Sequence, residues 1–213
     1  MSLQIDTSAV ETIDADWIIV GMNEDCSLCS RMEGLDNLLG GLLGRLKENK
    51  DLSGKLADVH KIYDLPNFAA KRMLIVGLGQ SEDVTRARIQ KAYRTAARVV
   101  SEKESVTVAI LSSGDYGDLT VSQFAEAASI AMTVGCVGQD LFQQEPKHHP
   151  LEKVTFVLNK DIDQQSFQEA VTRGEILGES TNLTRELVNL PAADIYPESF
   201  AKRAQKAAEE IGR

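Results

Sequence analysis

The strongest constraint on the fold is the alternation of short apolar runs with longer amphipathic segments. Met73-Leu74-Ile75-Val76 is a continuous apolar run that closes at Gly77, as expected of a central strand buried on both faces. A segment with apolar residues at helical spacing follows, from Ile89 to Val100. This alternation predicts an α/β fold, a three-layer arrangement with a sheet between helices and the continuous apolar strands at its centre.

Other segments repeat the pattern along the chain. Further strands are expected at Leu3–Asp6, Trp17–Val20, Val59–Asp64, Val106–Leu111 and Val154–Leu158. Further helices are expected at Leu35–Leu46, Thr120–Gly135 and Asp163–Val188, with Thr120 as a cap. The segments around Ile5 and Ile62 alternate rather than run continuously, which suggests that the sheet is mixed.

Charge and composition exclude several classes of protein. The net charge is −9, from 32 acidic and 23 basic residues, which argues against broad binding to a nucleic-acid backbone. No apolar run approaches the roughly 18 residues of a membrane span. The first residues include several carboxylates and no basic region before an apolar run, so no signal peptide is expected. Three cysteines form an odd set, which favours reduced thiols.

The turn Gly77-Leu78-Gly79 lies between a predicted strand and a predicted helix, where nucleotide-binding loops occur. The nucleotide fingerprint needs a third glycine three residues later, and that position holds Glu82, followed by Asp83. Two carboxylates would repel a pyrophosphate at the start of the helix. We therefore interpret the two glycines as a tight strand-to-helix turn.

The potential metal ligands do not form a recognisable site in the sequence. Cys26 and Cys29 have the C-x-x-C spacing, but no second pair completes a zinc site, and Cys136 is alone. His148 and His149 lie in a polar loop flanked by prolines, with no acidic residue at ligand spacing. The sequence therefore predicts no metal site in this chain.

Nucleophilic catalysis has no clear signature either. Ser112-Ser113-Gly114 and Ser129 do not lie in a nucleophile elbow, and none of the histidines, His60 included, belongs to a readable triad. The paired acidic residues favour an interpretation as solvated charges at helix ends; they are Glu102, Glu104, Glu209 and Glu210. The residues alone thus predict no catalytic, cofactor-binding or metal-binding side chain.

A sharp boundary lies between Asn189 and Ser199. Pro191 has no N–H to donate and pushes Leu190 out of the helical region, so the long helix should end there. Pro197 suits the first position of a new helix, and Glu198 in its first turn suits the helix dipole. We therefore predict a domain over residues 1–190, followed by a linker and one helix over residues 191–213.

Three stretches, in the same order, carry a resemblance to a known family. They are Leu35 to Lys55 with its leucine stripe, Leu74 to Gly79 with the Ala/Arg-rich helix after it, and Thr184-Arg185-Glu186-Leu187-Val188-Asn189-Leu190-Pro191 followed by Tyr196-Pro197-Glu198-Ser199-Phe200-Ala201. Together they resemble the N-terminal domain of cytosol-type leucyl aminopeptidases, the M17 peptidase family, and its junction with the catalytic domain. Tyr196 departs from the small polar cap expected before Pro197.

The resemblance implies a function for a longer protein. That protein would be a metal-dependent aminopeptidase, a cytoplasmic hexamer that removes N-terminal residues, often leucine, from peptides. Two divalent metal ions, Zn or Mn, would be held by a C-terminal catalytic domain of which residues 191–213 would be the first part. No position of this chain matches the catalytic motifs, so no catalytic or metal residue is carried over, and the chain alone is predicted to be inactive.

The family's N-terminal domain has a macro-domain-like fold, and its implied role is architectural: it shapes assembly and access to active sites elsewhere. Its partners would be its own catalytic domain and further copies of the protein. The alternative is a macro-domain-like module that binds ADP-ribose or a related nucleotide. A nucleic-acid-binding accessory role is least favoured, because the chain is acidic.

Overall fold

The sheet forms the centre of the molecule. The structure is a computed structural model that describes residues 1–25, 30–104, 106–112, 116–138, 140 and 143–210. Within these residues six strands pair in the order β1-β6-β5-β2-β4-β3. The strands are β1 (Ser2–Asp6), β2 (Trp17–Asn23), β3 (Val59–Tyr63), β4 (Arg72–Gly79), β5 (Thr107–Leu111) and β6 (Lys153–Val157). All pairs are parallel except β3 with β4, so the predicted mixed sheet is confirmed.

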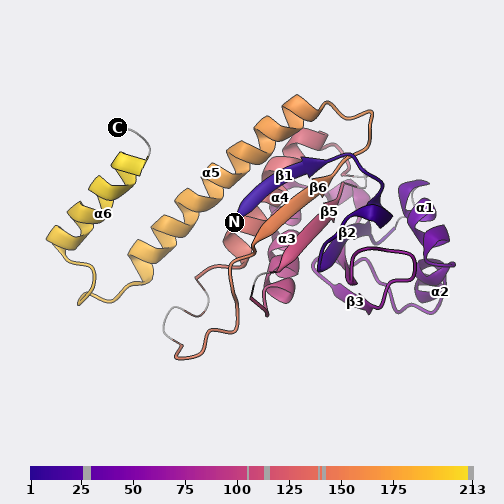
Figure 1. The fold of residues 1–213 in the computed structure, drawn as a ribbon, viewed down its shortest axis with the longest axis horizontal. Helices are drawn as coiled ribbons and strands as arrows, with labels where there is room; N and C mark the ends of the chain where they lie inside the picture. Colours follow the sequence, from indigo (N-terminus) through magenta and orange to yellow (C-terminus); the bar gives the residue numbers. More distant parts are fainter. Residues whose placement is uncertain (26–29, 105, 113–115, 139, 141–142, 211–213) are drawn as a thin grey trace.

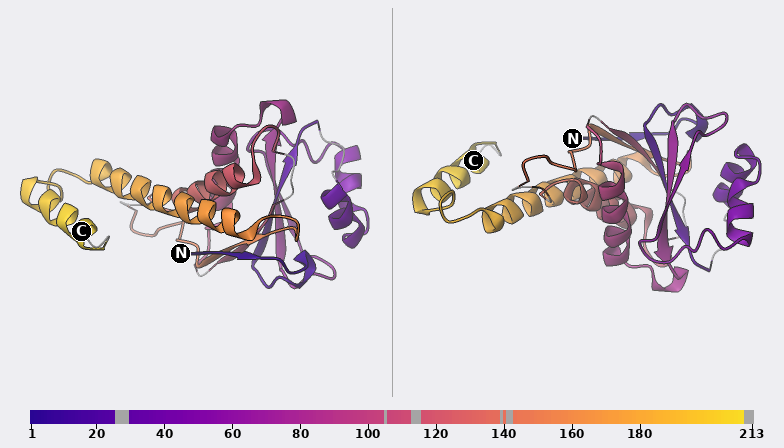
Figure 2. Two further views of the ribbon diagram at one scale, coloured as in Figure 1. Left: turned by 90° about the horizontal axis from the view of Figure 1, so that it is seen from above. Right: turned by 90° about the horizontal axis from the view of Figure 1, so that it is seen from below.

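Helices cover both faces of the sheet and make three layers. Figure 2 shows α1 and α2 on one side of the sheet and α3, α4 and α5 on the other. The helices are α1 (Ser30–Leu38), α2 (Leu42–Glu48), α3 (Arg86–Val100), α4 (Val121–Gly135), α5 (Gln164–Asn189) and α6 (Pro197–Glu210). The three-layer fold with a C-terminal helix is therefore confirmed.

Side chains of the central strands alternate between two cores, because successive residues of a strand point to opposite faces. On β2, Trp17 and Ile19 belong to the core under α3 and α4, whereas Ile18 and Val20 belong to the core under α1 and α2. The continuous apolar runs of β2 and β4 are thus buried on both faces, as their sequences predict.

Two boundaries differ from the sequence-based expectation. The helix predicted over Leu35–Leu46 is broken into α1 and α2, because Gly40 and Gly41 adopt φ of +63° and +75°. Strand β2 does not end at Gly21 but continues to Asn23. A Cβ atom at Gly21 would lie 3.0 Å from a Leu78 methyl group, so this glycine allows close packing under α3 rather than a turn.

The helix ends follow the predicted capping residues. Thr120 accepts a hydrogen bond from the backbone N–H of Gln123, whose side chain accepts one from Thr120 N, so α4 begins with a capping box. Helix α6 begins at Pro197, as predicted. Ser199 Oγ accepts a hydrogen bond of 2.9 Å from the Tyr196 N–H, which holds the residue before Pro197 against the first turn of α6.

Helix α5 is the longest element, with 26 residues and a length of about 39 Å. It packs against α4 and β1. Figure 1 shows that its second half runs past the sheet and leads to α6, which lies away from the rest of the molecule. Among the described helices none is long and apolar enough to cross a membrane.

Candidate functional site

The last residues of β4, Gly77 to Gly79, are covered by another segment of the chain, residues 53–57. Gly79 N donates a hydrogen bond of 3.0 Å to Gly54 O, and Ala57 N donates one of 2.9 Å to Gly77 O. A Cβ atom at Gly77 would lie 1.9 Å from the Lys55 carbonyl oxygen. Glycine is therefore required at position 77 for the close approach of this segment, and the space and one N–H donor that a phosphate would use are taken by the chain itself.

The start of α3 also has its contacts within the chain. Thr85 caps α3 by accepting a hydrogen bond of 3.3 Å from Arg88 N, and Asp83 forms an ion pair of 3.0 Å with Arg88. Glu82 and Asp83 lie in a short 3-10 turn before the cap rather than in the first turn of α3. Gly77, Leu78 and Gly79 thus form the end of strand β4 rather than the predicted strand-to-helix turn, which follows at residues 80–84. The end of the strand and the start of α3 are both occupied by contacts within the chain.

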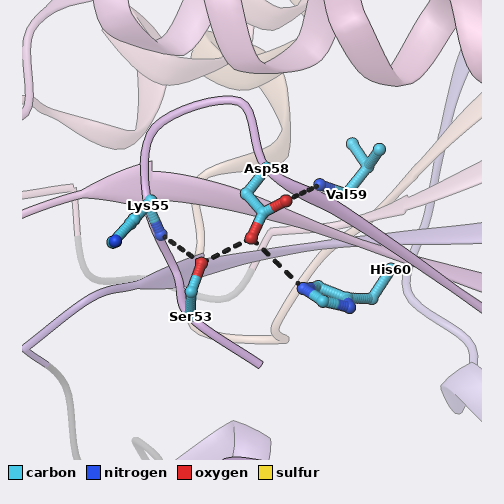
Figure 3. A network of polar contacts seen from close by, with 5 residues as sticks. All are labelled: Ser53, Lys55, Asp58, Val59 and His60. Carbon is cyan, nitrogen blue, oxygen red and sulfur yellow. Dashed lines mark hydrogen bonds and ion pairs between the residues drawn. The ribbon is translucent and has the colours of Figure 1, made fainter. Parts of the chain in front are cut away.

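Ser53, Asp58 and His60 form a polar network on the covering segment, shown in Figure 3. Asp58 Oδ2 accepts a hydrogen bond of 2.5 Å from Ser53 Oγ and lies 3.3 Å from His60 Nε2. Asp58 Oδ1 accepts one of 3.1 Å from Val59 N. The hydrogen bond from Ser53 is the main cause that lowers the pKa of Asp58; burial opposes it, and His60 lowers the pKa further.

The order of these three side chains excludes a catalytic triad. In a triad the imidazole lies between the hydroxyl and the carboxylate, so that it can accept the hydroxyl proton. Here the carboxylate of Asp58 lies between Ser53 and His60, and the hydroxyl donates to it (Figure 3). The network therefore ties residues 53–57, which cover Gly77, to the start of β3, and it does not activate a nucleophile.

The remaining candidate nucleophiles have structural contacts. Ser112 Oγ donates a hydrogen bond of 2.8 Å to Val157 O in the core, and Ser129 is fully buried. Cys136 is buried, and burial raises the pKa of its thiol, which disfavours the reactive thiolate. The other residues singled out in the sequence, Cys26, Cys29, Ser113 and Gly114, lie outside the described residues.

His148 has an acidic partner, Asp140, which the spacing of ligand residues in the sequence does not indicate. Its Nδ1 lies 3.0 Å from Asp140 Oδ2, which also accepts hydrogen bonds from the backbone N–H groups of Lys147 and His148. Burial would raise the pKa of Asp140, but these hydrogen bonds outweigh it and lower the pKa. The two partners are eight positions apart in the sequence, so their pairing has no local signal there.

The described residues do not fit a metal centre. Asp140 and His148 supply one carboxylate and one imidazole, and the described part of the chain contains no group of three or more His, Cys, Asp or Glu residues placed to hold an ion. His149 is paired at 3.8 Å with Glu104, and Glu102 with Lys61 at the same distance, both at the surface. Glu209 accepts a hydrogen bond from Gln205 of its own helix.

The contact between α4 and α5 depends on two side chains that sequence reasoning did not single out. Asn182 Nδ2 donates a hydrogen bond of 3.0 Å to Thr133 O, and Arg185 Nη1 donates one of 3.1 Å to Val134 O. Both acceptors are carbonyls in the last turn of α4, where the backbone N–H partners of a continuing helix are missing. Burial lowers the pKa of Arg185, and the nearby charges of Arg94 and Arg98 act in the same direction.

The comparisons with known proteins identify this architecture. The family model described as "Cytosol aminopeptidase family, N-terminal domain" matches residues 19–146, which is more than half of the chain. The chain therefore belongs to the cytosol aminopeptidase family and contains its N-terminal domain.

Relatives and solved structures agree with this assignment. A probable cytosol aminopeptidase of Bacillus licheniformis is 28% identical over 203 residues, which cover 91% of this chain and 39% of the relative. A mutant of tomato leucine aminopeptidase superposes with a TM-score of 0.80 at 22% identity, over 100% of this chain and 43% of that one. The bottromycin maturation enzyme BotP in complex with Mn superposes with a TM-score of 0.69 at 21% identity, over 93% and 37%. The chain thus spans less than half the length of these proteins.

Proposed function

We propose that this chain is the non-catalytic N-terminal domain of a metal-dependent leucyl aminopeptidase. The whole protein would remove N-terminal amino acids from peptides in the cytoplasm. The single observation that carries the proposal is the family match, which falls on the N-terminal domain of proteins more than twice as long as this chain. The described residues fit the non-catalytic part, because they bring together no metal-holding group and no nucleophile beside a base.

The role that we propose for the domain is architectural: it would support assembly into a hexamer and shape access to active sites in the catalytic domain. The outer half of α5 supports this role, because it carries exposed apolar side chains and lies beyond the sheet (Figure 1). Apolar side chains in such numbers on one helix are typical of a surface that another part of an assembly covers. They are Ile176, Leu177, Leu183 and Val188.

Two divalent metal ions, Zn or Mn, would belong to the catalytic domain. The relative BotP is described in complex with Mn, which is consistent with such a requirement in the family. We assign no step of the reaction to side chains of this chain. We also propose that the boundary between the two units lies at residues 190 and 191, where α5 ends.

The direct test is an activity assay of the 213-residue chain with Mn²⁺ or Zn²⁺ and leucine amide as substrate. We expect no turnover above the rate without protein. Turnover that persists through a second purification, and that is lost with a chelator, would overturn the proposal. The full-length B. licheniformis relative, assayed in parallel, checks that the conditions support hydrolysis.

A chimaera tests the architectural role. The N-terminal part of the B. licheniformis relative is replaced by residues 1–190 of this chain, and the oligomeric state is measured by light scattering. We expect a hexamer with aminopeptidase activity, and a lower oligomer when the same relative simply lacks its N-terminal part. A hexamer of equal stability and activity in the truncated relative would show that the domain has no role in assembly.

A further inference from the structure

A row of three side chains crosses the sheet at the end opposite Gly79. Tyr63 of β3 pairs with Arg72 of β4, and Trp17 of β2 occupies the next position in the same row. The Arg72 guanidinium carbon lies 5.3 Å from the centre of the Trp17 ring, and the Trp17 and Tyr63 rings meet edge to face with their centres 6.0 Å apart. Two aromatic rings and a guanidinium are thus held together by strand register.

A cavity of about 200 Å³ lies over this row. Trp17, Tyr63 and Arg72 form part of its wall, and Lys61 of β3 adds a second cation. The carboxyl end of α3 and the residues after it complete the wall with Val99, Glu102 and Lys103. The wall therefore combines apolar ring surface with charged side chains from β2, β3, β4 and the end of α3.

The charges around the cavity are not balanced. Lys61 and Glu102 form a weak pair at 3.8 Å. Among the described residues neither Arg72 nor Lys103 has a carboxylate within ion-pair distance, so the wall carries an excess of two positive charges in a chain with a net charge of −9. The carboxyl end of α3 contributes only about half a negative charge, which Arg98 in its last turn already opposes. A bound anion would neutralise the positive charge that remains on the wall of the cavity.

We propose that this cavity binds a small aromatic anion, a single planar ring with a carboxylate or phosphate head group. The planar guanidinium of Arg72 suits the oxygen atoms of such a head, and Lys103 and Lys61 add charge. Tyr63 is 60% exposed and offers a ring face for stacking. The volume limits the ligand to about one ring with its head group, since sites for larger ligands occupy at least about 300 Å³.

Trp17 makes the proposal directly testable, because it is the single tryptophan of the chain and lies in the wall of the cavity. Its fluorescence is followed while benzoate or phenyl phosphate is added at constant ionic strength, with chloride as the balancing ion. We expect a saturable change with at least one of these probes. Acetate, which lacks the ring, and benzamide, which lacks the charge, should each bind at least about tenfold more weakly. Comparing the affinity for benzoate with that for phenyl phosphate shows whether the cavity prefers a carboxylate or a phosphate head group.

Variants locate the site. Lys103→Gln and Tyr63→Ala change exposed side chains, and each is expected to weaken binding of the better probe by about fivefold or more. Lys91→Gln is the matched control, because it removes the same charge from an exposed position about 14 Å along α3 from its last residue, Val100. Circular dichroism verifies that each variant is folded. A fluorescence change that does not saturate, or that is the same in Lys103→Gln and Lys91→Gln, would overturn the proposal.

Discussion

Gly178 of α5 lies directly against Thr133 of α4. A Cβ atom added to Gly178 would come within 2.6 Å of the Thr133 Cβ, and one added to Gly174 would come within 2.6 Å of Glu126 O. These two glycines, one helical turn apart, let the two helix backbones approach closely. The close approach also places Asn182 and Arg185 within reach of the last carbonyls of α4.

We therefore expect Gly178→Ala to destabilise the domain by about 1–3 kcal/mol, as is typical when a methyl group is forced into a packed interface. Denaturant unfolding measures the change. Gly34→Ala is the control, because a Cβ atom there meets nothing within 4 Å and α1 should gain about 0.5–1 kcal/mol from the better helix former. Equal effects of the two substitutions would contradict the packing argument.

Arg185 belongs to the segment that carries the family resemblance, and its role here is to cap α4. We expect Arg185→Gln to lower the free energy of unfolding by about 1 kcal/mol, because Val134 O loses a charged donor. Thr181→Ala serves as control, since that hydroxyl donates to Leu177 O of its own helix. The control should change stability by less than about 0.5 kcal/mol. A larger loss in the control than in Arg185→Gln would argue against the capping role.

The Ser53–Asp58 hydrogen bond should make stability depend on pH. The pKa of Asp58 is lowered in the folded protein, so its contribution is fully present above the unfolded value of about 4 and is lost as the pH falls through the lowered folded value. The substitution Ser53→Ala removes the hydrogen bond that is the main cause of the lowered pKa of Asp58. At neutral pH we expect a loss of about 0.5–1 kcal/mol, small because Asp58 is partly exposed.

The measurement is the difference in unfolding free energy between the wild type and Ser53→Ala as a function of pH. This difference should shrink as the pH falls below about 4, down to the contribution of the hydrogen bond from Lys55 N to Ser53 Oγ, which does not depend on the charge of Asp58. Ser8→Ala is no suitable control, because Ser8 also lowers the pKa of a carboxyl group, that of Asp6. Ser180→Ala is suitable, because its hydroxyl donates to Ile176 O. A difference between the wild type and Ser53→Ala that is constant with pH would contradict the role of Asp58.

Local signals in the sequence were sufficient for most elements of the fold. The apolar run at Met73–Val76, the capping residue Thr120 and the two prolines at 191 and 197 each act on their immediate neighbours, and the structure has the predicted elements there. The break between α1 and α2 was missed because the leucine spacing continues across Gly40 and Gly41. Periodicity does not report on a change of backbone conformation when the apolar spacing is preserved.

The contacts that define the candidate site left no such local signal. Gly77 was interpreted as a turn glycine, yet its strictest constraint is the Lys55 carbonyl, 22 residues earlier in the chain. Arg185 reaches a carbonyl 51 residues away, and the row at Trp17 joins three strands. Such contacts depend on strand order and on how helices pack, neither of which is encoded by the spacing of residues in one segment.

The boundary after Leu190 remains a prediction with a clear physical basis. Helix α6 is joined to α5 by an ion pair between Arg203 and Glu186, and its Phe200 is half exposed. A chain that ends at Leu190 should therefore unfold within about 0.5 kcal/mol of the full chain, because surface ion pairs contribute little. A chain that ends at Gly178 should be destabilised by about 2 kcal/mol or more, because it also loses both caps of α4. Thermal and denaturant unfolding of both truncated chains measure this contrast. If the chain ending at Leu190 lost as much stability as the shorter one, α6 would be part of the folded unit and the boundary would lie elsewhere.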